Sequence, residues 1–369
     1  MPRHVYIHVP FCARRCSYCD FSIAVRRSTP VAEYLEALGR ELRPVEPTNV
    51  DTIYFGGGTP SRLGGDGVKQ LLEIVTSRYR PEPDAEITLE ANPEDVTAVA
   101  ATAWREAGVN RLSLGVQSFD DGVLRWMHRT HDSVTAQRAI GIARDAGIAN
   151  VSLDLIFSLP ENLKRDWRED LDTALSLRPD HVSLYGLTIE PATPLGRWRD
   201  RGIVSEAPDQ SYETEYLLAH TALSSAGFEH YEVSNFAKPG CHSRHNSAYW
   251  TGRPYAGHGP SAHRFDGTTR SWNEPAYARW VELLLNGGTA ESGRETLTPE
   301  QRRLEAVYLG LRTRAGLPLA SADRPIVQRW VEAGWAMERG EDVVLAPMGW
   351  LRLDALVSSL TEHGSPCNV

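Results

Sequence analysis

The first half of the chain alternates short hydrophobic runs with amphipathic stretches, and this alternation restricts the fold more than any other feature. Six runs have the length and composition of strands: Val5 to Val9, Thr52 to Phe55, Glu86 to Glu90, Arg111 to Val116, Val151 to Phe157 and His181 to Tyr185. The stretches between them have helical periodicity: Val31 to Arg43, Val68 to Arg78, Val96 to Ala107, Ser133 to Ala146 and Trp167 to Leu177. Successive β/α units predict an α/β fold in which helices cover a parallel sheet. Periodicity alone leaves a partial barrel and an open doubly wound sheet as alternatives.

The pattern changes after Tyr185. The sequence predicts a long helix over Tyr212 to Ala226 and a strand over Glu229 to Phe236. From about residue 296 it predicts three helices and one short strand: Glu300 to Arg312, Ile326 to Met337, Val343 to Leu345 (the strand) and Trp350 to Leu360. This order indicates a small winged-helix-like α+β domain. We therefore expect a barrel or sheet domain over 1–235, a connecting region over 236–295 and a C-terminal domain over 296–369.

Three of the five cysteines stand together directly after the first predicted strand: Cys12, Cys16 and Cys19. Cysteine thiolates are the usual ligands of iron-sulfur clusters, and a four-iron cluster held by three cysteines leaves one iron open. A structural zinc would need a fourth ligand, either His8 or a distant residue such as Cys241 or His242. A disulfide would leave one thiol over. The spacing favours a cluster over zinc.

The cysteine spacing, with Tyr18 just before the last cysteine, resembles the signature of radical S-adenosylmethionine enzymes. In that family the open iron binds S-adenosylmethionine, and an electron from the cluster splits it to a 5′-deoxyadenosyl radical. The longer string from Tyr6 to Phe21 is similar to the branch that contains the oxygen-independent coproporphyrinogen III dehydrogenases and related heme chaperones. The resemblance implies a partial (β/α)6 TIM-like barrel, a 4Fe-4S cluster on the three cysteines, and S-adenosylmethionine.

Glycines and polar residues stand at or near the ends of the predicted strands. A run of three glycines and Thr59 follows the second strand, the third ends in Glu90, and the fifth carries Asp154. Ligands of α/β folds bind at the carboxyl ends of parallel strands, and glycines allow close approach of the backbone. Singly each residue has a structural explanation, as a turn or a helix cap, but together they indicate a site. The resemblance assigns to S-adenosylmethionine the residues Tyr6, Tyr18, Gly57, Gly58, Thr59, Glu90, Gln117, Arg129, Asp154 and Gly186.

A second segment with chemically versatile side chains runs from Cys241 to Trp250. Histidine and cysteine hold heme iron, and aromatic rings pack on a porphyrin. A lone histidine is more often simply hydrogen-bonded within the protein. The pattern His245-Asn246-x-x-Tyr249-Trp250 is similar to a motif linked to heme binding in the heme chaperones of this branch. The resemblance implies heme as a cofactor and His245 as its ligand.

Charge and hydropathy exclude several classes. The 369 residues carry a formal charge of -9, which argues against a nonspecific nucleic-acid binder. From Glu291 onward nine Arg and no Lys face eleven acidic residues, so we expect the C-terminal domain to serve packing or partner docking. No apolar run is long enough to span a bilayer, and the first residues lack the core of a signal peptide. We expect a cytoplasmic protein, leave peripheral membrane contact open, and interpret Cys367 as inert.

Two functions from different classes would use the same barrel. A dehydrogenase would abstract hydrogen from the propionates of coproporphyrinogen III, which leads by oxidative decarboxylation to protoporphyrinogen IX. A heme chaperone would bind heme and transfer it to acceptor proteins, with an electron donor as a further partner. Dehydrogenases of the branch carry another cysteine where this chain has Phe21, and a long extension where only five residues precede Tyr6. Together with the motif at His245, these differences favour the chaperone, and they leave enzymatic activity open.

Overall fold

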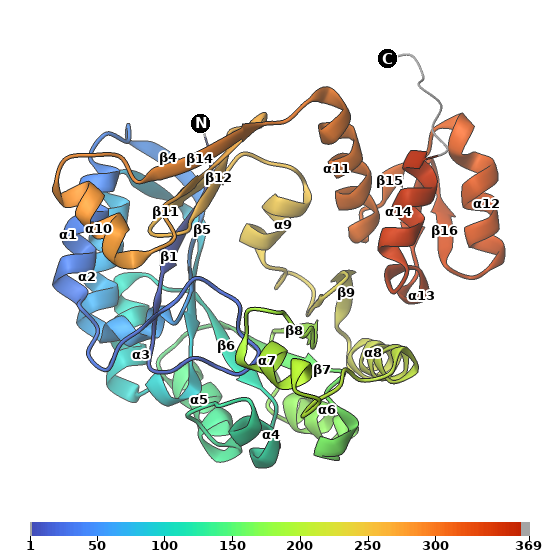
Figure 1. Ribbon diagram of the computed structural model, residues 1–369, viewed down its shortest axis with the longest axis horizontal. Coiled ribbons are helices and arrows are strands. Elements are labelled where there is room, and N and C mark those ends of the chain that lie inside the picture. Colours follow the sequence, from blue (N-terminus) through green and yellow to red (C-terminus); the bar gives the residue numbers. More distant parts are fainter. Residues whose placement is uncertain (1, 363–369) are drawn as a thin grey trace.

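A curved nine-stranded sheet, with the order β11-β1-β4-β5-β6-β7-β8-β10-β9, forms the centre of the computed structural model, which describes residues 2–362 (Figure 1). Six of its strands are parallel and follow one another in chain order: β1 (His4–Val9), β4 (Thr48–Gly57), β5 (Tyr79–Ala91), β6 (Arg111–Gln117), β7 (Asn150–Phe157) and β8 (His181–Gly186). A doubly wound sheet would reverse its strand order part-way across. The uninterrupted order therefore confirms the partial barrel.

Helices cover the outer face of this sheet (Figure 1). They are α1 (Val31–Leu42), α2 (Gly64–Thr76), α3 (Ala98–Ala107), α4 (Asp121–Trp126), α5 (Ser133–Asp145), α6 (Trp167–Ser176) and α8 (Asp209–Ser225). Several begin at a side chain that accepts a hydrogen bond from the first turn, as Thr97, Asp132 and Asp166 do. The apolar core lies between sheet and helices, with the Trp104 side chain fully buried in it. Each helix predicted for this half is present, with small shifts at its ends.

The strand predicted over Glu229 to Phe236 is wrong, because the segment forms a hairpin. Strand β9 (Glu229–Glu232) turns into β10 (Asn235–Ala237), which pairs antiparallel with β8. The Glu232 carboxylate accepts hydrogen bonds from the Ser234 backbone N–H, at 3.1 Å, and from the Asn235 side chain. These bonds within the segment close the turn.

Residues 236–295 contribute strands to the main sheet and to a separate sheet. After α9 (Arg244–Trp250), strand β11 (Ala256–His258) pairs in parallel with the outer edge of β1. A separate antiparallel sheet follows, made of β12 (His263–Phe265), β13 (Thr269–Asn273) and β14 (Glu291–Thr296), and α10 (Tyr277–Leu285) packs beside α1. The region thus completes one edge of the main sheet.

The C-terminal lobe combines helices with a three-stranded antiparallel sheet around its own apolar core. Its elements are α11 (Pro299–Arg312), β15 (Leu317–Pro318), α12 (Arg324–Glu332), β16 (Ala336–Arg339), β17 (Asp342–Leu345), α13 (Pro347–Trp350) and α14 (Leu353–Glu362). The α+β prediction is confirmed, with two corrections. The helix predicted to reach Met337 ends at Glu332, because Gly334 adopts a left-handed conformation (φ 74°) and starts the turn into β16. The last predicted helix is divided into α13 and α14, and Cys367 lies outside the described residues.

No helix within residues 2–362 is both long and apolar enough to cross a membrane.

The lobe is joined to the barrel through the end of α11. Backbone hydrogen bonds link Arg314 N–H to Tyr231 C=O (2.9 Å) and Val233 N–H to Arg312 C=O (3.2 Å). The Arg312 guanidinium lies 2.9 Å from the Glu232 carboxylate, which is completely buried, and 4.1 Å from the centre of the Trp250 ring. Because a buried carboxylate is costly without its partner, this ion pair is central to the junction.

We expect Arg312→Ala to lower the free energy of unfolding by about 3–5 kcal/mol, because it leaves Glu232 buried and uncompensated. Urea denaturation measures this loss. Arg294→Ala is the control, since Arg294 is 70% exposed and its partner Glu291 keeps a second ion pair with Arg264. That variant should lose less than about 1 kcal/mol. Equal losses in the two variants would contradict a special role for the junction.

Candidate functional site

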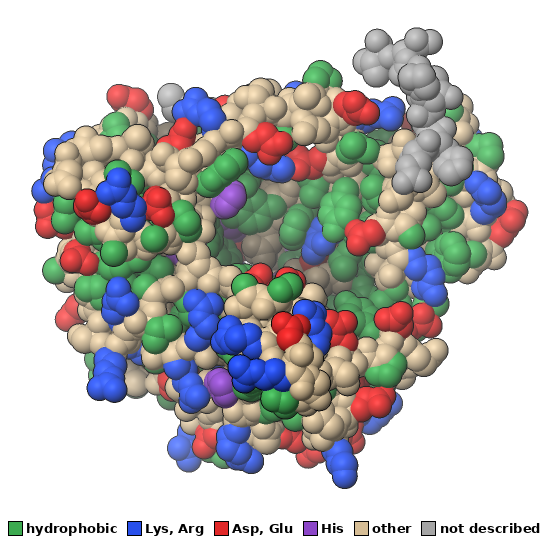
Figure 2. Space-filling view, viewed as in Figure 1, with side chains coloured by type: hydrophobic (Ala, Val, Ile, Leu, Met, Phe, Trp, Pro, Cys, Tyr) green, Lys and Arg blue, Asp and Glu red, His purple; other side chains and the backbone are tan. Residues whose placement is uncertain are grey.

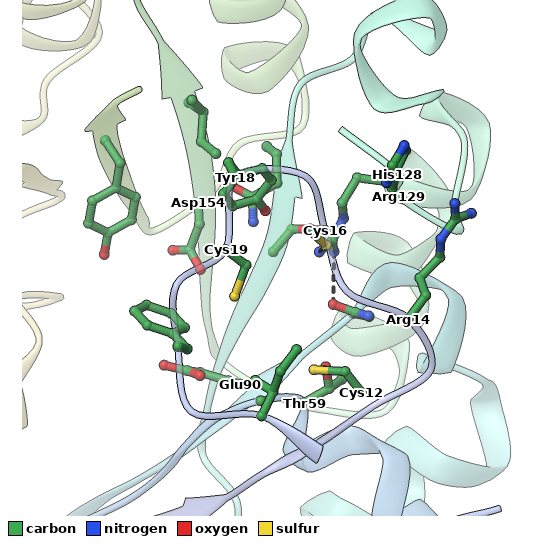
Figure 3. Close-up of a pocket in the computed structure, with 18 of the residues that line it drawn as sticks. Cys12, Arg14, Cys16, Tyr18, Cys19, Thr59, Glu90, His128, Arg129 and Asp154 are labelled. Atoms are coloured by element: carbon green, nitrogen blue, oxygen red, sulfur yellow. Dashed lines mark hydrogen bonds between the residues drawn. The ribbon is translucent and has the colours of Figure 1, made fainter. Parts of the chain in front are cut away.

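A cavity of about 350 Å³ opens at the carboxyl ends of the parallel strands. It brings together every site residue predicted from the sequence except Tyr6 and His245. The predicted residues in its wall are Cys12, Cys16, Tyr18, Cys19, Gly57, Gly58, Thr59, Glu90, Gln117, Arg129, Asp154 and Gly186 (Figure 3). Residues spread over more than 170 positions thus share one pocket, as expected for strand ends of a parallel barrel.

The cysteine loop forms one wall of this cavity. It begins and ends in two short strands, β2 (Phe11–Cys12) and β3 (Ala24–Val25), which pair in parallel. In its middle, the Ser17 N–H donates to Met127 C=O at 3.1 Å and the Ser17 C=O accepts from Leu195 N–H at 2.9 Å. The loop is therefore held at both ends and at its centre. The three cysteines are free thiols.

The thiols fit a multi-iron cluster better than a single ion. No three His, Cys, Asp or Glu side chains within residues 2–362 gather around one point as a single metal ion requires. A four-iron cluster presents its iron atoms at separate corners, so its thiolate ligands need not converge on one point. Burial raises the pKa of Cys12, and it raises the pKa of Cys19 to about 11. These thiols must therefore lose their protons before they can ligate a metal.

The glycine loop after β4 forms a second wall. Gly57 has a left-handed backbone (φ 111°), and a Cβ at Gly58 would lie 2.6 Å from the Pro10 carbonyl carbon and oxygen. The Gly57 N–H donates to the Glu90 carboxylate at 3.1 Å. Only residues without a side chain allow this loop to pack so tightly against the segment that precedes the cysteines.

Two partly buried carboxyl groups and a guanidinium face this pocket, with Glu90 and Asp154 on one side of Figure 3 and Arg129 on the other. Burial raises the pKa of both carboxyl groups, that of Glu90 to about 7. The Arg129 Nη2 donates to Asn92 Oδ1 (2.8 Å) and to Gly115 C=O (2.7 Å), while its buried Nε has no hydrogen-bond partner among the described residues. Acceptors and a cation in one pocket suit a ligand that carries both an ammonium and a carboxylate.

The end of β6 departs from regular strand geometry. Gln117 has a positive φ of 70°, and the pairing of β6 with β7 shifts by one residue at this point. Positive φ is costly for a residue with a side chain and is concentrated at binding sites. The bulge gives Gln117 a place in the pocket wall.

The two remaining predicted residues lie outside the pocket wall. The Tyr6 hydroxyl contacts His8 Nδ1 at 3.1 Å, and its ring stacks on Tyr54. His245 is only 1% exposed, its Nδ1 lies 2.7 Å from Thr52 Oγ1, and its Nε2 lies 2.8 Å from the Tyr249 hydroxyl. Ligation of heme iron by His245 stays a prediction, and it requires one of these hydrogen bonds to break.

The sequence missed several residues of the site. Ser113 donates to Asp154 at 3.2 Å, Tyr54 donates to Glu90 at 2.8 Å, and Phe21 and Tyr185 line the cavity with exposed rings. Ser113 and Tyr54 lie inside hydrophobic strands. The alternation of side chains along a strand shows which residues share a face of the sheet, but it does not predict that this face borders a pocket. A signal for Ser113 existed, because a polar residue in a run destined for burial needs a partner.

Comparisons with known proteins agree with this geometry. A model of the radical SAM superfamily matches residues 6–174. Coproporphyrinogen III oxidase (HemN) from Escherichia coli, a radical SAM enzyme, superposes with a TM-score of 0.80 over 96% of this chain and 89% of its own, at 22% identity. The fold and the pocket therefore define a radical SAM protein, a class that implies a 4Fe-4S cluster and S-adenosylmethionine.

Two curated relatives identify the group within this class. The heme chaperone HemW of Synechocystis is 39% identical over 331 residues, which cover 87% of this chain and 80% of the relative. HemW of Mycobacterium tuberculosis is 38% identical over 369 residues, which cover 97% and 95%. The chain belongs to the HemW family.

We expect Gly58→Ala to distort the pocket, because the added Cβ meets backbone atoms that cannot turn away. The variant should lose about 1–3 kcal/mol in urea denaturation and bind S-adenosylmethionine more weakly. Gly39→Ala is the control: Gly39 lies inside α1, and no atom outside the neighbouring turns of its own helix lies within 4 Å of the position that an added methyl group would take. It should gain up to about 1 kcal/mol. A Gly58→Ala protein with parental stability and affinity would contradict the close packing.

We expect the carboxyl group of Glu90, whose pKa is raised by partial burial, to make the cofactor-free protein less stable as the pH rises. The unfolded chain releases this proton near pH 4.5, whereas the folded chain holds it to about pH 7, so stability falls between these values. Glu90→Gln removes the titration. Relative to the parent, the variant should therefore gain about 2 kcal/mol in urea denaturation between pH 5 and pH 8. The same difference at both pH values would contradict a raised pKa.

Proposed function

We propose that this protein is a heme chaperone that carries a 4Fe-4S cluster and S-adenosylmethionine in its barrel. The observation that carries the proposal is the similarity to HemW proteins, which in one relative extends over 97% of the chain. We infer heme binding from these relatives, which are heme chaperones. Heme-acceptor proteins and an electron donor are the partners that the proposal requires, and the cytoplasm is the location that we expect.

We assign the cluster to Cys12, Cys16 and Cys19, and S-adenosylmethionine to the wall formed by the glycine loop, Glu90, Asp154 and Arg129. When bound, the cluster supplies single electrons next to the open iron. The carboxyl groups accept hydrogen bonds from an ammonium or from ribose hydroxyls, and Arg129 pairs with a carboxylate. The division into a barrel, a connecting region and a docking lobe remains our proposal for the working units.

An apolar hollow supports the binding of a large planar ligand. Figure 2 shows the centre of this face hollowed between barrel and C-terminal lobe, with hydrophobic side chains inside. Phe21 and Tyr185 line the cofactor cavity and expose 62% and 46% of their surface. Exposed rings of this kind offer flat faces for a porphyrin. They are candidates for heme contact besides His245.

A dehydrogenase is the second candidate. The superposition on HemN favours it, but at 22% identity this similarity establishes the fold alone. Phe21 stands where the dehydrogenases are expected to carry a further cysteine, and a phenyl ring has no thiol chemistry to offer. The chaperone is therefore the better proposal.

The test is an anaerobic assay of the reconstituted protein with S-adenosylmethionine, an electron donor and coproporphyrinogen III, with a heme titration in parallel. We expect no conversion to protoporphyrinogen and stoichiometric binding of heme. A variant with Cys12, Cys16 and Cys19 all replaced should lose the iron-sulfur absorbance and serves as the cluster-free control. Catalytic formation of protoporphyrinogen would overturn the chaperone proposal, and persistence of the absorbance would overturn the cluster assignment.

A further inference from the structure

Three aromatic rings cluster inside the barrel beside the glycine loop: Tyr6, Tyr54 and His245. The three ring centroids form a triangle, 6.1 Å from Tyr54 to Tyr6, 5.0 Å from Tyr54 to His245 and 6.5 Å from Tyr6 to His245, and the Tyr54 ring makes an angle of 28° with each of the other two. His245 is fixed at both nitrogens by Thr52 and Tyr249. The Tyr6 hydroxyl is held by His8, so the Tyr54 ring packs against two rings that are themselves held by hydrogen bonds.

The Tyr54 hydroxyl reaches from this cluster to Glu90, which lines the cofactor pocket. It donates to Glu90 Oε1 at 2.8 Å, while the Gly57 N–H donates to Glu90 Oε2 at 3.1 Å. Each carboxylate oxygen of Glu90 thus has one donor from strand β4. These two bonds set the direction in which Glu90 presents its remaining acceptor positions to the cavity.

Helix α9 is tied to the same strand as Glu90. The Arg244 and His245 backbone N–H groups donate to the two oxygens of Glu86, at 2.9 Å and 3.0 Å. Glu86 and Glu90 lie four residues apart on β5, and therefore on the same face of the sheet. The helix that carries His245 is consequently attached to β5 through Glu86 and to Glu90 through Tyr54.

We propose that Tyr54, held by the ring of His245, is a positioning residue that orients Glu90 for S-adenosylmethionine and couples helix α9 to the cofactor pocket. The proposal rests on the proposed function only in placing S-adenosylmethionine in this pocket. His245 acts in it through the shape of its ring, whereas heme ligation would act through a ring nitrogen. The two roles can be separated by substitution.

The first test measures the affinity of cluster-loaded protein for S-adenosylmethionine by equilibrium dialysis. We expect Tyr54→Phe, which keeps the stack and removes the donor, to bind about 5- to 10-fold more weakly. Tyr216→Phe is the control: it removes another buried hydroxyl, one that donates to Val233 C=O at 2.8 Å, away from the cavity. It should bind like the parent. Parental affinity in Tyr54→Phe would overturn the proposal.

The pH dependence of this affinity separates positioning from a general structural effect. Loss of the Tyr54 donor disfavours the charged form of Glu90, so the pH midpoint for binding should move upward in Tyr54→Phe. The titratable and charged groups that face Glu90 are Tyr6, Tyr54, Arg111, Asp154, Tyr185 and Tyr249. All but Tyr54 are unchanged in the variant. Weaker binding with an unmoved midpoint would mean a structural effect only and would overturn the role of the hydroxyl.

Two substitutions at His245 complete the test. His245→Ala removes the stacking surface and should weaken S-adenosylmethionine binding as much as Tyr54→Phe does. His245→Phe keeps an aromatic surface without ring nitrogens and should restore most of the affinity, with melting temperature and cluster absorbance checked in each variant. Equal loss in both His245 variants would overturn the stacking role.

A heme titration of the same proteins keeps the inference distinct from the chaperone proposal. Absence of heme binding in the parent would refute the chaperone proposal and leave the Tyr54 result standing.

Discussion

The parallel, in-order pairing of six strands is the constraint on which the rest of this structure depends. It aligns Tyr6 with Tyr54 and Tyr54 with Thr88 across β1, β4 and β5. Strands in such a register end at one level. The cysteine loop after β1, the glycines at the end of β4 and Glu90 at the end of β5 therefore lie together, although they are far apart in the sequence. The pocket follows from strand pairing more than from any local motif.

The interior of the barrel contains buried polar side chains. Thr52, Ser113, Ser152 and His181 are buried on its inner side, and the Ser152 hydroxyl lies 2.8 Å from His181 Nδ1. Buried polar groups need partners, so these side chains form hydrogen-bonded links between neighbouring strands. The links from Tyr54 to Glu90 and from Ser113 to Asp154 belong to this pattern, and both reach residues of the cavity wall. Interior polarity thus connects the base of the barrel with the site at its mouth.

The junction with the C-terminal lobe follows the same physical principle. Arg312 neutralises Glu232 in a position without access to water, and its guanidinium also covers Trp250 of helix α9. The lobe, the hairpin of β9 and β10, and the segment with His245 therefore share one buried contact. A change in the position of Arg312 would alter its packing on helix α9, and α9 is attached to β5 through Glu86. The hollow in Figure 2 lies between the parts joined in this way.

The sequence alone determined the six β/α units, the grouping of the cysteines and the glycine run, because periodicity, spacing and glycine content are local properties. Other residues of the pocket wall, such as Gln117 and Arg129, were predicted only through the resemblance to a known family. The sequence could not separate a barrel from an open sheet, since the two differ only in how strands pair over long distances. Nor could it show the hairpin at Glu232, where side-chain hydrogen bonds override a continuous strand pattern. His245 shows the limit most clearly. Its motif predicts a ligand, but the tertiary structure surrounds its ring with Thr52, Tyr54 and Tyr249, and burial and hydrogen bonding of this kind arise only when distant strands and helix α9 come together.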